Sequence, residues 1–310
     1  MNSLHAVEAV RIWDKSPYNA FTDLIHYKGR FFCGFREAPT HHAEDGLGSI
    51  RILESKDGKT WASIAVLSDP EFDLRDPKFS VTPKGELMMA LGAVRPKGKG
   101  ETRIQTMAYF SRDGKKWGTR VPIGEAGFWL WRITWHQGKA YSVGYQSGRT
   151  EVLRLYVSED GRKFTTLVND FRIPDYGNEA TMVFDKDGTA HCFVRRDGGT
   201  MSSMWGTSQA PYTDWKWQDM VTRVGGPHVI QVPDGRYFGV VRYIESGIRR
   251  VSVIQIDPAT GKMTEIEKLP SSNGDSGYAG LVWKDGALWT SYYSTHENRR
   301  TSIFLARWKP

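Results

Sequence analysis

The chain has 310 residues, a net charge of +7 and 12 Trp among its 13% aromatic residues. Its lysines and arginines are scattered rather than gathered in a run, which argues against a nucleic-acid-binding surface. No apolar run approaches the length of a membrane span, and residues 1–13 contain no apolar segment typical of a signal peptide. We therefore expect no nucleic-acid partner and no membrane span, while the sequence leaves the cellular compartment unknown.

The first predicted element is a strand over Val7–Trp13, and the last is a strand over Ser302–Trp308. Between them a pair of strands recurs around a short glycine turn, most clearly as strand Ala180–Phe184, turn 185–188 and strand Thr189–Arg195. The turn glycines are 47 to 56 residues apart, at Gly29, Gly85, Gly138, Gly188, Gly235 and Gly286.

A period near 50 residues built from strand pairs is typical of a β-propeller, in which each repeat forms one blade. We predict an all-β, six-bladed propeller of four-stranded antiparallel blades that occupies residues 1–310 as a single domain. The strand Val7–Trp13 should pair with the last blade, Tyr278–Trp308, and complete it, because this closure removes a free sheet edge.

The outer halves of the first three repeats share a Ser-x-Asp-Gly-x-x-aromatic motif, which begins at Ser55, Ser111 and Ser158. In such a turn the Asp side chain caps backbone N–H groups and the glycine adopts positive φ. The aromatic residue then packs onto the blade. We interpret these three motifs as structural.

Charged and phenolic residues recur at fixed distances from the turn glycines. Seven residues after them stand Arg36, Gly92, Tyr145, Arg195, Arg242 and Tyr293, and six to nine residues before them stand Asp23, Asp76, Arg132, Glu179, His228 and Tyr278. Equal distances along alternating strands predict that both sets meet at one end of the central channel. The arginines, with Arg75, could bind a carboxylate through paired hydrogen bonds.

Three of these residues suggest catalysis. A free Tyr is a weak nucleophile with a pKa near 10, so Glu179 beside Tyr278 could activate it by taking its proton. Asp45, on a loop before the third strand of its repeat, could act as a general acid. The alternatives are a reaction with two carboxylates, such as Asp45 with Asp76 or Glu179, and a channel in which acids and arginines only pair with each other.

Three segments resemble the sialidase superfamily of six-bladed propellers, in addition to the Ser-x-Asp-Gly motifs, which resemble its Asp-boxes. Residues 35–38 (FREA) with Asp45 are similar to the segment that carries the acid/base Asp. Asn178-Glu179 with Arg195 is similar to the segment that holds the Glu partner and a substrate-binding arginine. Residues 275–281 (DSGYAGL) are similar to the segment of the nucleophilic Tyr. The family's Arg-Ile-Pro motif is replaced by residues around Thr22-Asp23, so the resemblance implies a sialidase-like enzyme for another sugar.

The predicted function is an exo-acting, sialidase-like glycoside hydrolase for an acidic or deoxy sugar, with a glycan as its partner. Tyr278, Glu179 and Asp45 are the predicted catalytic residues. The predicted substrate-binding residues are Asp23, Arg36, Glu37, Arg75, Asp76, Arg132, Asn178, Arg195, His228 and Arg242. We expect no cofactor and no metal, and we interpret His41 and His42 as exposed residues. A non-catalytic carbohydrate-binding propeller and a polysaccharide lyase that uses Tyr278 and His228 remain alternatives.

Overall fold

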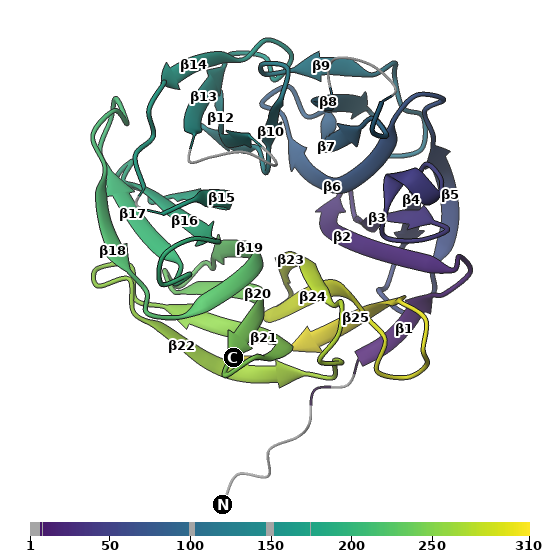
Figure 1. The fold of residues 1–310 in the computed structure, drawn as a ribbon. Helices are drawn as coiled ribbons and strands as arrows, with labels where there is room; N and C mark the ends of the chain where they lie inside the picture. The colour runs from purple at the N-terminus through teal and green to yellow at the C-terminus, as the bar shows by residue number, and fades with distance from the viewer. Residues whose placement is uncertain (1–6, 8, 99–102, 147–151, 174) are drawn as a thin grey trace, which may run out of the picture.

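The computed structural model describes residues 7, 9–98, 103–146, 152–173 and 175–310. Within these residues, six antiparallel sheets surround a central axis, and β1 lies beside β25 where the ring closes (Figure 1). The predicted six-bladed all-β propeller is therefore confirmed. A single 3-10 turn, η1 (Ala43–Asp45), is the helical element of the described residues, and no helix in this part of the chain is long and apolar enough to cross a membrane.

Each blade runs from an inner to an outer strand, and the chain passes through the blades in order. Blade one contains β2 (Tyr18–Tyr27), β3 (Arg30–Ala38), β4 (Ser49–Ser55) and β5 (Ala62–Leu67). Blade two contains β6 (Asp73–Val81), β7 (Leu87–Val94), β8 (Ile104–Ser111) and β9 (Val121–Ile123). Blade three contains β10 (Phe128–Leu130), β11 (Thr134–His136), β12 (Lys139–Gln146), β13 (Leu153–Ser158) and β14 (Thr165–Val168).

The second half of the ring has the same plan. Blade four contains β15 (Gly177–Phe184), β16 (Ala190–Arg196), β17 (Met204–Ser208) and β18 (Lys216–Asp219). Blade five contains β19 (Arg223–Gln231), β20 (Tyr237–Glu245), β21 (Ile248–Ile256) and β22 (Met263–Leu269). Blade six contains β23 (Gly277–Lys284), β24 (Ala287–Ser294), β25 (Ser302–Trp308) and the N-terminal strand β1 (Ala9–Trp13).

The pairing of β1 closes the ring as the sequence predicts. Ala9 lies opposite Ala306, and Arg11 lies opposite Phe304, in an antiparallel ladder. Closure by the two ends of the chain satisfies the backbone groups of β25 that would otherwise form a free sheet edge. The six predicted turn glycines also behave as expected, because all of them have positive φ, between 67° and 92°.

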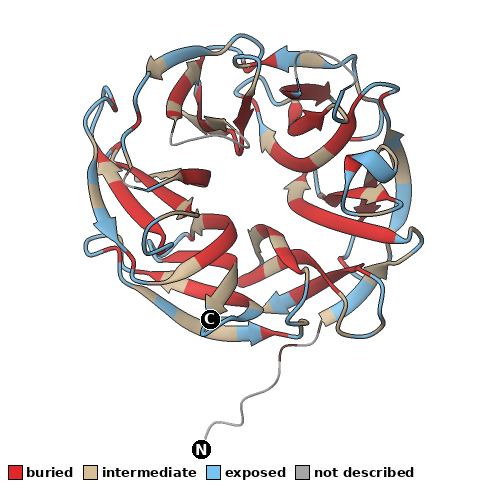
Figure 2. Cartoon of the chain, in the orientation of Figure 1, coloured by how far each residue is buried: buried red, intermediate tan, exposed pale blue. Residues whose placement is uncertain are grey.

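The hydrophobic core consists of apolar layers between neighbouring blades, and Figure 2 shows buried residues along the inner strands and exposed ones mainly on the outer strands and loops. One buried cluster lies between each adjacent pair of blades. The Ser-x-Asp-Gly turns pack against the preceding blade. A Cβ at Gly114 would lie 2.3 Å from Phe32, and one at Gly58 would lie 2.5 Å from Trp289. These contacts fix each blade against its neighbour.

Candidate functional site

The site is built on a β-bulge that recurs in five inner hairpins. At each bulge two residues of the inner strand lie opposite one residue of the next strand. The bulged pairs are Phe21-Thr22, Asp76-Pro77, Asn178-Glu179, Gly226-Pro227 and Tyr278-Ala279. Phe21, Asp76 and Tyr278 have positive φ of 58°, 51° and 48°. Bulges redirect side chains and are common beside active sites, and such backbone strain, roughly 1–3 kcal/mol per residue, is typical of functional positions.

Tyr278 lies at the centre of the site. Its Oη donates a hydrogen bond of 2.8 Å to Glu179 Oε1 and accepts one of 2.9 Å from Arg195 Nη1. Burial raises the pKa of Tyr278 and the charge of Glu179 raises it further, although Arg195 and Arg242 oppose the shift. The phenol is therefore protonated at neutral pH, and the carboxylate that could receive its proton is already in hydrogen-bond contact.

Glu179 and Arg195 are held by neighbours from blades four and five. Glu179 Oε2 accepts a hydrogen bond of 2.7 Å from the Gly226 N–H and lies 3.0 Å from Arg195 Nη1. Arg195 also contacts Asp197 at 2.9 Å, and Asn178 donates to that same carboxylate at 2.8 Å. Burial alone would lower the pKa of Arg195, but the charges of Glu179 and Tyr278 raise it above its ordinary value. Arg195 therefore stays charged.

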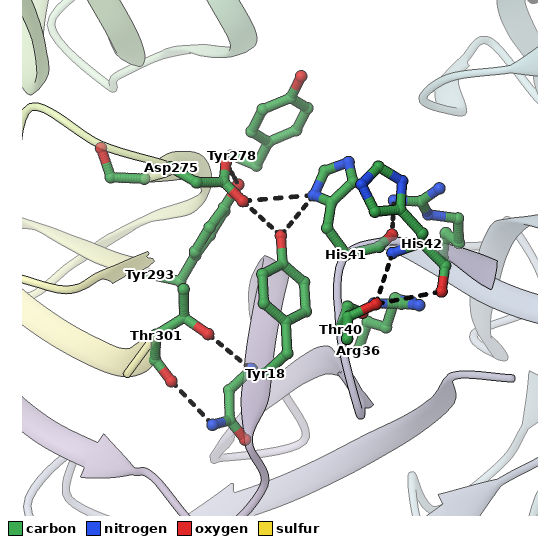
Figure 3. A network of polar contacts seen from close by, with 12 residues as sticks. Tyr18, Arg36, Thr40, His41, His42, Asp275, Tyr278, Tyr293 and Thr301 are labelled. Atoms are coloured by element: carbon green, nitrogen blue, oxygen red, sulfur yellow. Dashed lines mark hydrogen bonds and ion pairs between the residues drawn. The ribbon is translucent and has the colours of Figure 1, made fainter. Parts of the chain in front are cut away.

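A second polar network adjoins Tyr278, and Figure 3 shows Asp275 joined to Tyr18 and His41. Arg242 lies over the Tyr278 ring, 4.7 Å from its centroid, and donates to Asp275 Oδ1 at 2.9 Å. Burial alone would raise the pKa of Asp275, but the hydrogen bond with His41 and the charge of Arg242 hold it well below its ordinary range. This network fixes the arginine that covers one side of Tyr278.

Asp76 is a buried carboxyl group with free hydrogen-bonding capacity. Its residue is 4% exposed, and its Oδ1 has no hydrogen-bond partner among the described residues. Burial raises its pKa to about 6, although Lys78 and Arg75 act in the opposite direction. Its charge and that of Glu179 influence each other, so Asp76 belongs to the same electrostatic site as the Tyr278–Glu179 pair.

Below the bulges, a layer of charged side chains crosses the axis of the ring. Asp23 of blade one accepts two hydrogen bonds, of 3.1 and 3.2 Å, from Arg132 of blade three. His228 lies 3.7 Å from Asp23, and Lys78 Nζ donates to the Thr22 carbonyl at 3.0 Å. Burial, followed by the charge of Arg132, lowers the pKa of His228 well below its ordinary value. These residues, which we call the axial layer (Asp23, Lys78, Arg132 and His228), are all less than a tenth exposed.

A cavity of about 440 Å³ lies on the far side of the axial layer, where Arg132 and His228 line it together with the ends of the inner strands. Its other lining residues include Val81, His136, Phe184 and Gln231, which stand near the glycine turns. The predicted substrate-binding residues Asp23, Arg132 and His228 are therefore placed between this cavity and Tyr278.

Arg36 and Glu37 are not brought to Tyr278. Arg36 is fully buried, and its guanidinium binds Asp73 at 2.8 and 3.1 Å and the Thr40 carbonyl at 2.8 Å. Its guanidinium is thus committed to an ion pair within the chain, and its role in substrate binding stays a prediction. Glu37 projects from the other face of β3 and binds Trp13 and Arg51, each at 2.6 Å.

The predicted acid Asp45 lies exposed on η1, where its carboxylate accepts a hydrogen bond of 2.7 Å from Thr40 Oγ1. Arg75 supports the same loop by donating to the His41 carbonyl at 3.0 Å, and its guanidinium lies over the Phe21 ring. His41, at 5.5 Å, and Tyr278, at 5.3 Å, each contact that ring edge-on. The loop that carries Asp45 is thus anchored beside the Tyr278 site.

Three polar residues of the site were not predicted, namely Tyr18, Lys78 and Asp197. Lys78 could have been noticed, because a lysine within a buried inner strand is unusual. Asp197 directly follows two arginines of a predicted strand end, which suggests a local ion pair. No sequence pattern marks Tyr18. Among the described residues, no group of three or more His, Cys, Asp or Glu side chains is arranged to hold a metal ion.

No family model and no curated protein matches the sequence. Among solved structures, a Dyadobacter fermentans protein of unknown function matches with a TM-score of 0.83 at 20% identity, over 98% of each chain. An α-L-arabinofuranosidase from Fusarium graminearum matches with a TM-score of 0.75 at 17% identity, over 98% of each chain.

A Trypanosoma rangeli sialidase mutant that displays trans-sialidase activity matches with a TM-score of 0.73 at 12% identity, over 97% of this chain and 59% of that chain. The chain thus spans about three fifths of the sialidase it matches. These likenesses concern the fold, which is the six-bladed β-propeller that this chain shares with a sialidase and an arabinofuranosidase.

Proposed function

We propose that the protein is an exo-acting glycoside hydrolase in which Tyr278 is the nucleophile and Glu179 its general base. The observation that carries this proposal is the hydrogen bond of 2.8 Å from Tyr278 Oη to Glu179, with Arg195 donating to the same phenol oxygen. A hydroxyl with an adjacent base, oriented by a third group, is the arrangement of an activated nucleophile. The α-L-arabinofuranosidase from Fusarium graminearum, which matches this chain over 98% of both chains, is a glycosidase and supports the same class of reaction.

The reaction would proceed in two displacements. Glu179 takes the phenolic proton as Tyr278 Oη forms a bond to the anomeric carbon, and the leaving oxygen receives a proton from a carboxylic acid. In the second step that carboxylate takes a proton from water, whose oxygen attacks the anomeric carbon. The bond to Tyr278 then breaks, and Glu179 returns the proton to the phenolate. Arg195 stabilises the phenolate oxygen in both steps through the hydrogen bond it already donates.

Two carboxyl groups are candidates for the acid. Asp45 has the position that the sequence predicts, on a loop beside the site and open to solvent. Asp76 has the more suitable ionisation, because burial raises its pKa to about 6, and a general acid works best with a pKa near the operating pH. We assign the role to Asp45 and retain Asp76 as the second candidate on account of its unpartnered oxygen.

The axial layer supports an exo-acting enzyme, which removes a sugar from the end of a glycan. The ion pair between Asp23 of blade one and Arg132 of blade three bridges two non-adjacent blades beneath the bulges, so we do not expect a glycan to pass through the centre of the propeller. A substrate that enters from the Tyr278 side must place a terminal sugar against this layer.

The decisive experiment is hydrolysis of a panel of aryl glycosides by the wild type and by Tyr278→Phe. We expect the variant to lose several orders of magnitude in kcat, while Asp45→Asn spares substrates with good leaving groups, since these need little acid assistance. Asp234→Asn, in an exposed pair with Arg236 at a glycine turn, is the matched control and should behave as the wild type.

A Tyr278→Phe variant with near-normal turnover would exclude the tyrosine mechanism and favour paired carboxylates. Binding of sugars without any turnover by the wild type would instead support a carbohydrate-binding propeller. Formation of an unsaturated product from a uronic-acid oligosaccharide would support a lyase.

A further inference from the structure

We propose that the sugar bound beside Tyr278 is uncharged, because the two arginines that contact this residue are neutralised by carboxylates of the protein itself. The proposal rests on the proposed glycosidase function and gives its substrate class: a neutral hexoside, pentoside or deoxyhexoside rather than a uronide or a sialoside. Of the two kinds of sugar that the sequence suggests, acidic or deoxy, the proposal excludes the acidic one.

Arg195 has no guanidinium nitrogen without a partner on the chain. Its Nη1 contacts Tyr278 and Glu179, while Nε and Nη2 both donate to Asp197. Two carboxylates thus surround one guanidinium, and Asp197 lies 3.6 Å from Arg223 as well. A substrate carboxylate would have to displace Glu179 or Asp197 from Arg195, and the displaced carboxylate would lose a charged partner in a partly buried site, which is costly.

Arg242 is held in the same way as an arginine that has a purely structural role. Arg36 of blade one binds Asp73, which stands three residues before the bulge residue Asp76 of the next blade. Arg242 of blade five binds Asp275, which stands three residues before the bulge residue Tyr278 of the next blade. Both arginines also have the same register, since each lies opposite the residue that precedes the bulge in its own hairpin. Arg242–Asp275 is therefore an inter-blade ion pair, repeated from Arg36–Asp73.

Aromatic side chains also contact the Tyr278 ring. Phe21, at the bulge of blade one, and Trp131 contact its ring edge-on at 5.3 and 5.7 Å. Two other cations lie near this site. Arg75 shares Asp73 with Arg36 and donates to the His41 carbonyl. Lys78, whose ammonium group lies 5.1 Å from the Trp131 ring, donates to the Thr22 carbonyl in the axial layer. An anion placed against Arg195 and Arg242 would lose its hydration without gaining an unpaired counter-charge from either of them, whereas the hydroxyl groups of a neutral sugar can bond to the charged groups already present.

The test compares kcat/KM for neutral aryl glycosides with kcat/KM for aryl uronides and an aryl sialoside. We expect the wild type to prefer a neutral glycoside at least tenfold. Asp275→Asn should raise the ratio of acidic to neutral kcat/KM about tenfold or more, because it releases Arg242 from its counter-ion. Asp197→Asn should act in the same direction through Arg195, and Asp234→Asn should leave the ratio unchanged. A melting curve for each variant verifies folding.

Wild-type preference for an acidic glycoside would overturn the inference and leave the glycosidase function intact. If no glycoside is hydrolysed, the glycosidase function fails, and the inference is then tested by calorimetric binding of neutral and acidic monosaccharides. Tighter binding of the acidic sugar, or an unchanged selectivity in folded Asp275→Asn and Asp197→Asn, would overturn it. Tighter binding of the neutral sugar, with the shift in both variants, would support it.

Discussion

Replacing Arg132 by Met should destabilise the propeller strongly, because it leaves a fully buried carboxylate without its counter-ion. Asp23 is 0% exposed, and among the described residues its remaining direct contacts would be the Phe79 N–H at 2.6 Å and the His228 ring at 3.7 Å. Breaking a buried ion pair from one side costs about 3–5 kcal/mol. With an unfolding entropy of about 2.1 cal/mol/K per residue over 310 residues, that loss corresponds to a decrease in Tm of about 5–8 °C.

Differential scanning calorimetry at neutral pH measures this change. The double variant Arg132→Met/Asp23→Leu should recover most of the loss, because it removes the orphaned charge as well as its partner. Arg172→Met, which removes one member of the exposed pair with Asp170, is the control and should leave Tm unchanged. A single variant that melts with the wild type would refute the view that the axial layer is a structural element, and would return Arg132 to the substrate-binding residues.

Two further changes test other parts of the molecule. Burial raises the pKa of Asp76 to about 6, so its contribution to stability is complete below the ordinary Asp pKa and is lost as the pH rises through about 6. Asp76→Asn should therefore raise Tm relative to the wild type at about pH 8 more than at about pH 5, and an equal effect at both would contradict the burial argument. If Asp76 supplies the catalytic proton, the same variant abolishes the decline of kcat/KM above about pH 6. Deletion of residues 1–13 removes β1 and exposes β25, so size-exclusion chromatography should show larger species; a monomer with wild-type Tm would contradict the closure argument.

The blades could be predicted because their turns are local. Each turn glycine must adopt positive φ in a tight hairpin, so six of them at regular spacing indicate six hairpins without any knowledge of tertiary contacts. The split of the innermost strand of blade three into β10 and β11 could not be predicted in this way. It depends on how residues 131–133 pack at the axis, which the periodicity of the segment does not encode.

The site could be predicted in part. The contact of Tyr278 with Glu179 was expected from the ends of their hairpins, and the structure confirms it. Counting seven residues from each glycine did not place the arginines equivalently, because the bulge of blade four lies one residue further from the turn glycine than in blades one and five. Blade one has a shorter turn, and blade five has four paired residues between turn and bulge instead of five. Arg195 lies opposite the bulge, between the pairs of Val194 and Arg196, whereas Arg36 pairs directly with Ala20. A difference of one residue moves a side chain to the other face of its strand, which no count along the sequence reveals.

The recurring bulge presents side chains of different chemistry at corresponding points of the ring. Regular pairing continues on both sides of each bulge, so the side chain at the bulge can change while the strands keep their register. The first residues of the five bulges are chemically unrelated, namely Phe21, Asp76, Asn178, Gly226 and Tyr278. The propeller can therefore be regarded as a scaffold that presents five variable positions at one depth. A new activity could be engineered by substitutions at those positions that, unlike Phe21, do not belong to an apolar layer between blades.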